Sequence, residues 1–303
     1  MRTLLRGMKG SVDRSPTAGV YAILVLQALL ASGTHIVAKV VVRDVEPFTL
    51  TLLRSLISAG AMGLILLLRG KMPHIRREDY RMVFGLSFLA IPVNQFLFLA
   101  GIRYTIASNA ALLYATTPII VLVFSRLFLG EPLTRRKILG VVLGFTGVTI
   151  VVFERGVSAS MEYLFGNLII FAAVLAWALY TVFGQKMIVR YGAIEASCVT
   201  LIGGTILFIP IGFVQALVFP YRTLTGANWG RILYLAIVTS VFSYLLWYYA
   251  LGRIETGKVA LFSNLQPILT TVLAVVLLGQ GVSAAFLIGG TIAIAGVVVA
   301  QFR

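Results

Sequence analysis

The chain has 303 residues, of which 59% are hydrophobic and 12% are charged, whereas soluble proteins average roughly 45 to 50% and about 25%. This composition excludes an ordinary soluble domain and predicts a protein whose main partner is the lipid bilayer. The formal net charge of +15 does not indicate a nucleic-acid partner, because the basic residues lie in short gaps between apolar runs rather than on one solvated face.

Apolar segments of about 20 residues, the length that crosses a hydrocarbon core roughly 30 Å thick, follow one another with only short gaps. The first exceeds the apolar region of a signal peptide, so we interpret it as an uncleaved span. We predict an all-α polytopic membrane protein with ten transmembrane helices, at Ala18 to Val42, Pro47 to Leu68, Met82 to Tyr104, Ala107 to Phe128, Ile138 to Phe153, Tyr163 to Val189, Ala193 to Phe219, Ile232 to Leu251, Val259 to Leu278 and Ala284 to Phe302.

Four pairs of proline and glycine residues recur at an offset of 149 residues and indicate an internal duplication. We predict a first five-helix repeat at residues 18–153 and a second at residues 163–302. Because each repeat holds an odd number of spans, the two must have opposite orientations, as in many secondary transporters built around a midplane site. The pairs are Pro118 with Pro267, Gly130 with Gly279, Gly140 with Gly289, and Gly147 with Gly296.

Lysine and arginine residues predict the orientation, because short cytoplasmic loops carry the excess of them. If the N-terminus is cytoplasmic, eighteen lie at the cytoplasmic ends of the spans and six at the outer ends. Arg135, Arg136 and Lys137 follow Gly130, whereas the turn after Gly279 has no basic residue, as expected for matched turns on opposite faces. We predict a multi-pass protein of a bacterial inner membrane with both termini in the cytoplasm.

Pro118 and Pro267 lie inside the fourth and ninth predicted spans, and we predict a hinge at each. Each proline removes a backbone hydrogen bond and displaces the carbonyl four residues earlier, that of Tyr114 or Ser263. A freed carbonyl inside a membrane needs a neighbour, water or a ligand. Matched interruptions in corresponding spans therefore indicate a substrate site.

Polar and aromatic residues gather around these prolines and in the neighbouring spans. Hydrocarbon offers such side chains no hydrogen-bond partner, so they usually face the interior of the bundle. Trp247 and Tyr248, near a span end, are interpreted as anchors at the membrane interface. The predicted substrate-binding residues are His35, Asn94, Gln95, Tyr114, Thr117, Trp177, Tyr180, Tyr244, Ser263, Asn264 and Gln266.

Charged residues are rare inside the predicted spans, and none of the ten Asp and Glu residues lies at the centre of one. Proton-driven carriers commonly use such carboxylates or a histidine. We therefore predict facilitative transport through a mostly uncharged cavity, with His35 the single candidate for proton coupling. Lys39 and Arg54 are expected to extend toward the interface; if they point into the cavity instead, they are candidate contacts for a carboxylate or phosphate.

Two long segments carry a family pattern. The first reads ALLYATTPIIVLVFSRLFLGEPLTRRKILGVVLGFTGVTIVVF, the second reads ALFSNLQPILTTVLAVVLLGQGVSAAFLIGGTIAIAGVVVAQF, and Trp177 and Lys186 lie near the start of the second half. This pattern resembles the EamA-type repeat of the drug/metabolite transporter superfamily, with Gln280 in place of an acidic residue often found there. The resemblance implies a ten-helix carrier or exporter of small metabolites. Similar members include amino acid exporters, the aromatic amino acid exporter among them.

We predict an exporter of small metabolites, with amino acids as the favoured substrates, that alternates access to a central cavity. One alternative is a carrier of phosphorylated or nucleotide-linked metabolites. An alternative of another class is an intramembrane lipid-modifying enzyme, although the sequence contains no catalytic set, metal site or cofactor motif. We expect no cofactor.

Small residues line one face of the fifth and tenth predicted spans. Such faces allow helices to approach closely, so we assign them to packing or to contacts in a homodimer. The chain is therefore predicted to be a monomer or a homodimer. The residues are Gly140, Gly144, Gly147, Gly289, Ala293 and Gly296.

Overall fold

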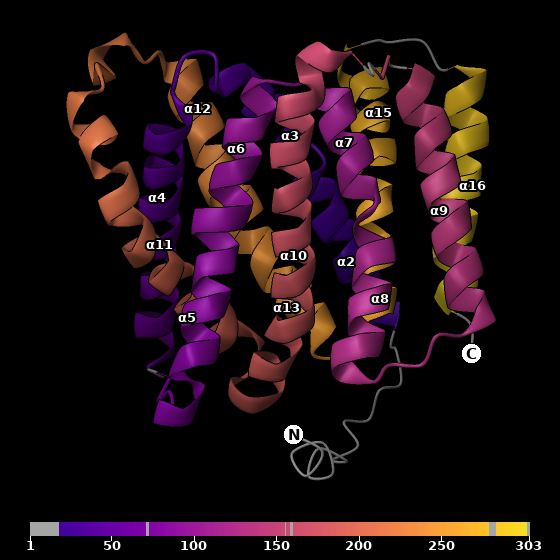
Figure 1. Cartoon of the computed structure of the whole chain (residues 1–303), viewed down its shortest axis with the longest axis horizontal. Coiled ribbons are helices and arrows are strands. Elements are labelled where there is room, and N and C mark those ends of the chain that lie inside the picture. The colour runs from indigo at the N-terminus through magenta and orange to yellow at the C-terminus, as the bar shows by residue number, and fades with distance from the viewer. Residues whose placement is uncertain (1–17, 71–72, 155, 158–159, 279–282, 302–303) are drawn as a thin grey trace.

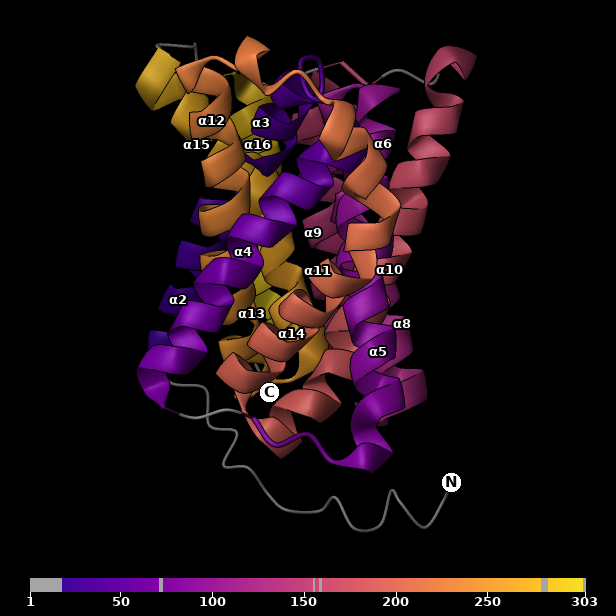
Figure 2. The same ribbon diagram turned by 90° about the vertical axis from the view of Figure 1, so that its left-hand side faces the viewer.

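The computed structural model describes residues 18–70, 73–154, 156–157, 160–278 and 283–301, and every regular element within these ranges is a helix. The helices form one bundle and run between its two ends (Figures 1 and 2). We call the end at which α2 (Ala18–Ala31) begins and α16 (Ala284–Gln301) ends the terminal end, and the other the opposite end. The predicted all-α membrane fold is confirmed, since nine stretches of the described residues are long and apolar enough to cross a membrane.

The first half of the chain forms five spans. The first is α2 followed by α3 (Thr34–Val41), and the second is α4 (Pro47–Arg69). The third begins with η1 (Arg77–Asp79) and contains α5 (Tyr80–Phe88), η2 (Leu89–Gln95) and α6 (Phe96–Arg103). The fourth is α7 (Ala107–Ala115) and α8 (Thr117–Leu129), and the fifth is α9 (Arg135–Glu154).

The second half forms the other spans in the same order. The sixth is η3 (Met161–Tyr163) with α10 (Leu164–Tyr191), and the seventh is α11 (Ala193–Val218), followed by the short η4 (Tyr221–Thr223). The eighth contains α12 (Gly226–Leu233), η5 (Tyr234–Phe242) and α13 (Ser243–Leu251). The ninth contains α14 (Thr256–Ala260), η6 (Leu261–Asn264) and α15 (Leu265–Leu278), and the tenth is α16.

Local signals explain how α4 begins and ends. The backbone angle of Pro47 suits the first helical turn. The carboxylate of Glu46 accepts the backbone N–H of Thr49 at 2.9 Å and that of Phe48 at 3.3 Å, so two donors that the helix leaves unpaired are satisfied. Gly70 ends the helix with a φ of 60°, in the left-handed region that glycine tolerates.

Some of the predicted spans were too short. The third span begins at Arg77 rather than Met82, and the eighth begins at Gly226 rather than Ile232. The first turns of these helices contain charged and polar residues that reach the membrane surface, and such residues lower the local hydropathy on which the prediction depends.

The inverted arrangement is visible where α9 and α16 pack along each other. Glu154 at the end of α9 accepts a hydrogen bond of 2.5 Å from the Ser283 hydroxyl, just before α16 begins, so the two helices run in opposite directions.

The glycine contacts between α9 and α16 are reciprocal. Gly140 lies against the carbonyl of Gly296, and Gly147 lies against the carbonyl of Gly289. Because Gly140 is the repeat equivalent of Gly289 and Gly147 that of Gly296, each glycine meets the equivalent of the other, which is the pattern of a two-fold axis. Of the two roles predicted for these small-residue faces, packing within the chain is therefore the one found between α9 and α16.

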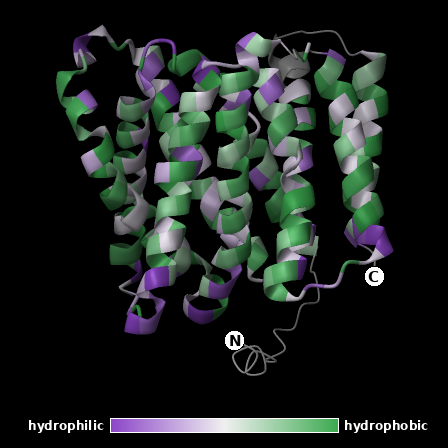
Figure 3. Cartoon of the chain, in the orientation of Figure 1, coloured by the Kyte–Doolittle hydropathy of each residue, from purple (hydrophilic) through white to green (hydrophobic). Residues whose placement is uncertain are grey.

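The distribution of hydropathy over the bundle is typical of a membrane protein. The outward faces of the helices are mainly hydrophobic along their length, and hydrophilic residues gather at the two ends (Figure 3). Large apolar side chains such as Leu68, Val218 and Leu127 are exposed. An exposed apolar belt of this kind fits contact with lipid chains.

Candidate functional site

A cavity of about 100 Å³ lies inside the bundle where the two halves meet. Most of its wall comes from the interrupted first, third, fourth, eighth and ninth spans, with Arg54 from α4 and Trp177 from α10. Of the residues predicted for the site, the cavity brings together His35, Arg54, Asn94, Gln95, Tyr114, Trp177, Tyr244, Ser263, Gln266 and Pro267. Its other lining residues are Gln27, Ala31, Thr34, Phe98, Ala111, Ala115, Thr239, Ser243 and Trp247.

The cavity lies on the axis that relates the two repeats. Nε2 of Gln95 donates a hydrogen bond of 3.3 Å to the Tyr244 hydroxyl, and these two residues are 149 positions apart. Equivalent residues that touch each other must lie at the axis that relates them. Three further lining pairs share this offset, namely Asn94 with Ser243, Phe98 with Trp247, and Tyr114 with Ser263.

The third and eighth spans both widen into a π-helix beside the cavity, at η2 and η5. The repeat offset carries residues 89–95 onto 238–244, which overlap η5, so the distortion is matched between the halves. π-turns disturb the regular backbone pairing and occur often at functional sites. We predicted regular helices here. Pro92 in η2 was a signal for the first distortion, but η5 contains no comparable residue.

The first span, predicted to be continuous, is broken between α2 and α3 at Ser32 and Gly33. The carbonyls freed by the break are satisfied from other spans: the Tyr234 hydroxyl donates to Leu30 at 2.7 Å, and the Thr270 hydroxyl donates to Ser32 at 2.5 Å. A Cβ at Gly33 would lie 2.6 Å from the Tyr234 oxygen, so only glycine allows this approach.

The predicted interruptions near the prolines of the fourth and ninth spans are confirmed. The fourth span changes from α7 to α8 at Thr116, two residues before Pro118. The ninth narrows into the 3₁₀ turn η6 shortly before Pro267. Pro267 lines the cavity and Pro118 does not, and hinge motion at either remains a prediction.

Arg54 points inward, so the expectation that it extends toward the interface was wrong. Its Nε donates to the Leu235 carbonyl at 3.0 Å and to the Ser240 hydroxyl at 2.8 Å, and Nη2 donates to the Thr239 hydroxyl at 2.9 Å. All three acceptors lie in the π-helix η5, and Arg54 is 4% exposed. No described carboxylate pairs with Arg54, and no Asp or Glu lines the cavity. Arg54 is therefore the one Lys, Arg, Asp or Glu residue in a wall that was predicted to be mostly uncharged.

Several polar atoms of the cavity wall lack a hydrogen-bond partner among the described residues. They include Nε2 of His35 and the side-chain oxygens of Gln27, Gln95 and Ser243. The His35 ring meets Phe98 and Tyr114 edge-on, at 5.5 and 5.3 Å between ring centroids. Buried polar groups usually have a partner, so a wall with four unpartnered groups is suited to a polar solute.

One wall of the cavity is aromatic. The ring centroid of Trp177 lies 5.2 Å from that of Tyr244 and 5.6 Å from that of Trp247. Trp247 is 1% exposed and its indole N–H donates to Thr181 at 3.3 Å, and Tyr248 is completely buried. The interpretation of Trp247 and Tyr248 as interface anchors was therefore wrong, because both side chains turn into the interior of the bundle, toward Thr181 and Tyr180 of α10.

Three predicted site residues lie outside the cavity. Tyr180 stands behind Trp177, with its hydroxyl 3.0 Å from that of Thr200. Asn264 is fully buried against Gly144, where an added Cβ would lie 2.6 Å from the amide nitrogen. Thr117 is also fully buried. Residues one turn away in the same spans face the cavity, and sequence spacing alone does not fix the rotation of an interrupted helix.

Lys39 also lies away from the cavity. Its ammonium donates to the carbonyls of Ile102 at 2.9 Å, Arg103 at 3.3 Å and Thr105 at 2.6 Å. The first two carbonyls belong to the last turn of α6 and the third follows it, and a cation is favourable at such a helix end. Lys39 thus ties the first span to the third.

A second void, of about 260 Å³, continues from the cavity toward the opposite end. The two share His35, Ala111 and Pro267. The second void extends to Ala107 at the start of α7 and to Val152 near the end of α9. The second void thus lies on the side of the cavity that faces the opposite end.

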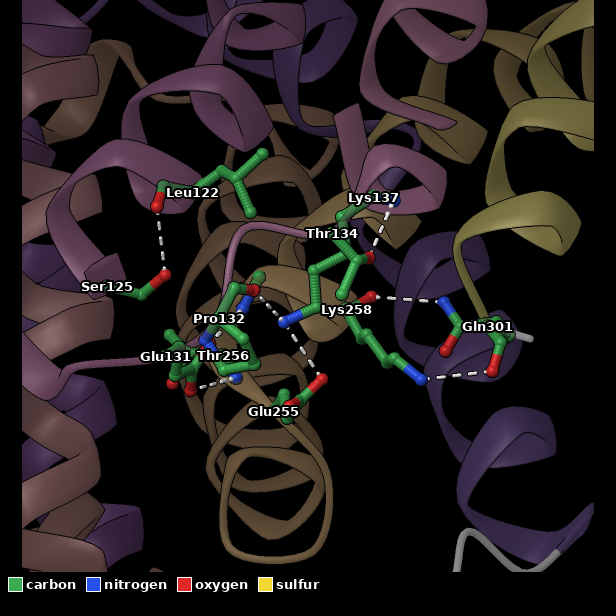
Figure 4. A network of polar contacts seen from close by, with 11 residues as sticks. Leu122, Ser125, Glu131, Pro132, Thr134, Lys137, Glu255, Thr256, Lys258 and Gln301 are labelled. Carbon is green, nitrogen blue, oxygen red and sulfur yellow. Dashed lines mark hydrogen bonds and ion pairs between the residues drawn. The ribbon is translucent and has the colours of Figure 1, made fainter. Parts of the chain in front are cut away.

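At the terminal end a polar network joins the two halves, and we call it the latch (Figure 4). The carboxylate of Glu131, after α8, accepts the backbone N–H of Thr256 at 2.8 Å and of Gly257 at 3.2 Å, at the start of α14. Nζ of Lys137 forms an ion pair of 3.0 Å with Glu255. Glu131 is 7% exposed and Lys137 is 2% exposed, so these bonds are shielded from water. Gln280, the repeat equivalent of Glu131, lies outside the described residues.

The lysine of the latch has a second contact. Nζ of Lys137 also donates to the carbonyl of Pro132 at 2.9 Å. Nearby, Lys258 and Gln301 join α14 to the end of α16, because Nζ of Lys258 donates to the Gln301 carbonyl at 3.0 Å. Within the described residues, no group of three or more His, Cys, Asp or Glu side chains is placed to hold a metal.

Comparison with known proteins gives a family. The model of the EamA-like transporter family matches residues 18–153 and 164–301. An uncharacterized transporter of Archaeoglobus fulgidus is 32% identical over 280 residues, which cover 91% of this chain and 95% of that protein. YetK of Bacillus subtilis, an uncharacterized transporter, is 26% identical and covers 97% of this chain and 90% of its own length. These relatives are transporters, so the alternative of an intramembrane enzyme is set aside.

A relative with a substrate in its name is more distant. The "Probable terminal-alkyne amino-acid exporter" of Streptantibioticus cattleyicolor is 25% identical over 75% of each chain. A solved crystal structure, 21% identical, aligns with a TM-score of 0.79 over 94% of this chain and 97% of its own, which shows the fold alone. The two matched segments span nearly the whole chain, which is therefore a member of the EamA-like transporter family, within the drug/metabolite transporter superfamily.

Proposed function

We propose that the protein exports small metabolites, with amino acids as the favoured substrates, by alternating access to the central cavity. The observation that carries this proposal is the position of the cavity on the axis between the inverted repeats, where Gln95 and Tyr244 meet. Sites at such an axis can be exposed to either membrane face by rocking one half against the other. The substrate-binding roles of the lining residues are part of the proposal.

The excess of lysine and arginine assigns the terminal end to the cytoplasm, so we propose a bacterial inner-membrane protein with both termini inside. In this orientation the latch joins the two halves on the cytoplasmic side and the second void lies on the outer side of the cavity, which supports the proposal that this conformation is closed to the cytoplasm. Export then requires the latch to open for loading. The absence of any Asp or Glu from the cavity wall favours facilitative transport, driven by the gradient of the substrate.

Flux into proteoliposomes that contain only this protein tests the proposal. A panel of labelled amino acids is offered with and without a pH gradient, and empty liposomes provide the background. We expect amino acid flux above background that does not depend on the pH gradient. If every amino acid stays at background, the proposal of amino acid export is wrong. If the rate follows the pH gradient and is lost in His35→Ala, the facilitative mechanism is wrong.

A carrier of phosphorylated metabolites is the second candidate, and Arg54 favours it because arginine is well suited to phosphate. Phosphate esters therefore belong in the same flux panel. Flux of a phosphate ester without flux of any amino acid would replace the first candidate by the second.

A further inference from the structure

The cavity presents a cationic donor whose binding capacity is not used. A guanidinium has five N–H groups. The bonds of Arg54 to η5 use Nε and Nη2, and Nη1 has no hydrogen-bond partner among the described residues. The side chain is held by three groups of one helix, so its orientation is fixed before a solute arrives. A preorganised fork of this kind suits a carboxylate.

Two residues of the cavity wall carry a side-chain amide oxygen without a partner, and such an oxygen accepts hydrogen bonds but has no proton to donate. The side-chain oxygens of Gln27 and Gln95 have no partner among the described residues, and these residues are 3% and 2% exposed. The orientation of the Gln95 amide is set by its Nε2, which donates to Tyr244. Two unpaired amide oxygens suit an ammonium group, which has three donors and no acceptor.

We propose that Arg54 binds the carboxylate of the substrate and that the oxygens of Gln27 and Gln95 bind its ammonium group, so that the substrate class is amino acids with one free carboxylate. This inference rests on the proposed transport function and deepens it. The aromatic wall at Trp177 and Trp247 receives an apolar side chain.

Charge distinguishes this class from phosphate esters. One carboxylate neutralises the single guanidinium, whereas a phosphate ester carries about −1.5 to −2 at pH 7. The excess negative charge would have no partner, because the other lining residues include no Lys or Arg.

The test uses four solutes that share a phenyl ring: phenylalanine, phenylalaninamide without the carboxylate, 3-phenylpropionate without the ammonium, and phenyl phosphate. Binding to the full chain in detergent is measured by calorimetry. We expect phenylalanine to bind at least about tenfold more tightly than each of the other three, because each lacks a charged hydrogen bond or adds an unpaired charge. Tighter binding of phenyl phosphate, or equal binding of phenylalanine and its amide, would overturn the inference.

Variants of the full chain test which residue binds the carboxylate and which binds the ammonium group. Arg54→Gln should remove the preference for phenylalanine over phenylalaninamide, and Gln95→Leu should reduce the preference over 3-phenylpropionate. Arg43→Gln removes an exposed arginine outside the cavity and should leave all four affinities unchanged. Arg54→Lys keeps the positive charge but lacks the planar guanidinium, so it should keep the preference for phenylalanine over phenylalaninamide at a lower affinity. This variant replaces Arg54→Gln in the test if Arg54→Gln does not fold. Retention of the wild-type preferences by a folded Arg54→Gln variant would refute the assignment.

Flux separates this inference from the proposed function. If wild-type proteoliposomes transport phenylalanine and Arg54→Gln transports it with the same preference over the amide, only the assignment of Arg54 fails. If the wild type transports no amino acid, the proposed function fails and this inference fails with it.

Discussion

Glu131 illustrates how single residues close one end of the bundle. Its carboxylate accepts two backbone N–H groups of α14 while almost fully buried. Hydrogen bonds to charged groups contribute about 1.5 to 3 kcal/mol each. Because these bonds join the first half to the second, they stabilise the conformation that is closed at the terminal end relative to the open one.

We predict that Glu131→Gln shifts the protein toward the conformation that is open at the terminal end. A neutral amide with one oxygen replaces two charged acceptors, so the closed state should lose about 1 to 3 kcal/mol. The measurement is labelling of a cysteine introduced at Ser125, in the Cys198→Ala background, by a membrane-impermeant thiol reagent applied from the terminal side. The control is Glu162→Gln, which removes an exposed carboxylate far from the latch. Equal labelling of both variants would contradict the role of the latch.

At Tyr234, the predicted effect is on stability. Tyr234→Phe removes the donor to the Leu30 carbonyl at the break of the first span. The bond is half-buried, and an unsatisfied carbonyl away from water costs up to about 1 to 3 kcal/mol, so thermal unfolding in detergent should occur at a lower temperature than in the wild type. Tyr80→Phe, at an exposed position in α5, should not change the unfolding temperature. An unchanged transition in Tyr234→Phe would show that this carbonyl finds another partner.

At the scale of elements, the order of the spans and the proline interruptions followed from apolar length and from the 149-residue repeat. The sequence did not predict the break at Gly33 or the π-turns of η2 and η5. Such backbone distortions are stabilised by distant partners such as Tyr234 and Arg54, which a local sequence pattern cannot reveal. The same reason explains why Asn264 was wrongly predicted to line the cavity. Its span was predicted, but the rotation of that span beyond η6 depends on packing against Gly144.

The α9–α16 contact gives a prediction at this scale. A Cβ at Gly147 would overlap the backbone of Gly289 and Ala293, so Gly147→Ala should lower the unfolding temperature and the yield of folded protein. Gly63, inside α4, has no atom within 4 Å of the added Cβ. Gly63→Ala should therefore stabilise the helix by about 0.5 to 1 kcal/mol. Measured unfolding temperatures that fall equally in both variants would show that close packing at Gly147 is not the cause.

At the scale of the molecule, the two halves enclose a cavity on their common axis. The latch closes one side, and the second void leads to the other. The repeat and the absence of central carboxylates could be read from the sequence, and they predicted the location of the cavity and most of its wall. The inward position of Arg54 could not be read from the sequence, because it depends on hydrogen-bond acceptors in η5 that are 181 to 186 residues away.

The central claim is that this cavity is the transport site. It is tested by the accessibility of a cysteine that replaces Ala111, a residue that lines both voids. In the Cys198→Ala background, an impermeant thiol reagent applied from the outer side should modify Ala111→Cys, and phenylalanine should slow the modification. Glu131→Gln should add modification from the cytoplasmic side. A cysteine at position 111 that reacts from neither side, or that phenylalanine does not protect although the protein transports it, would contradict the account.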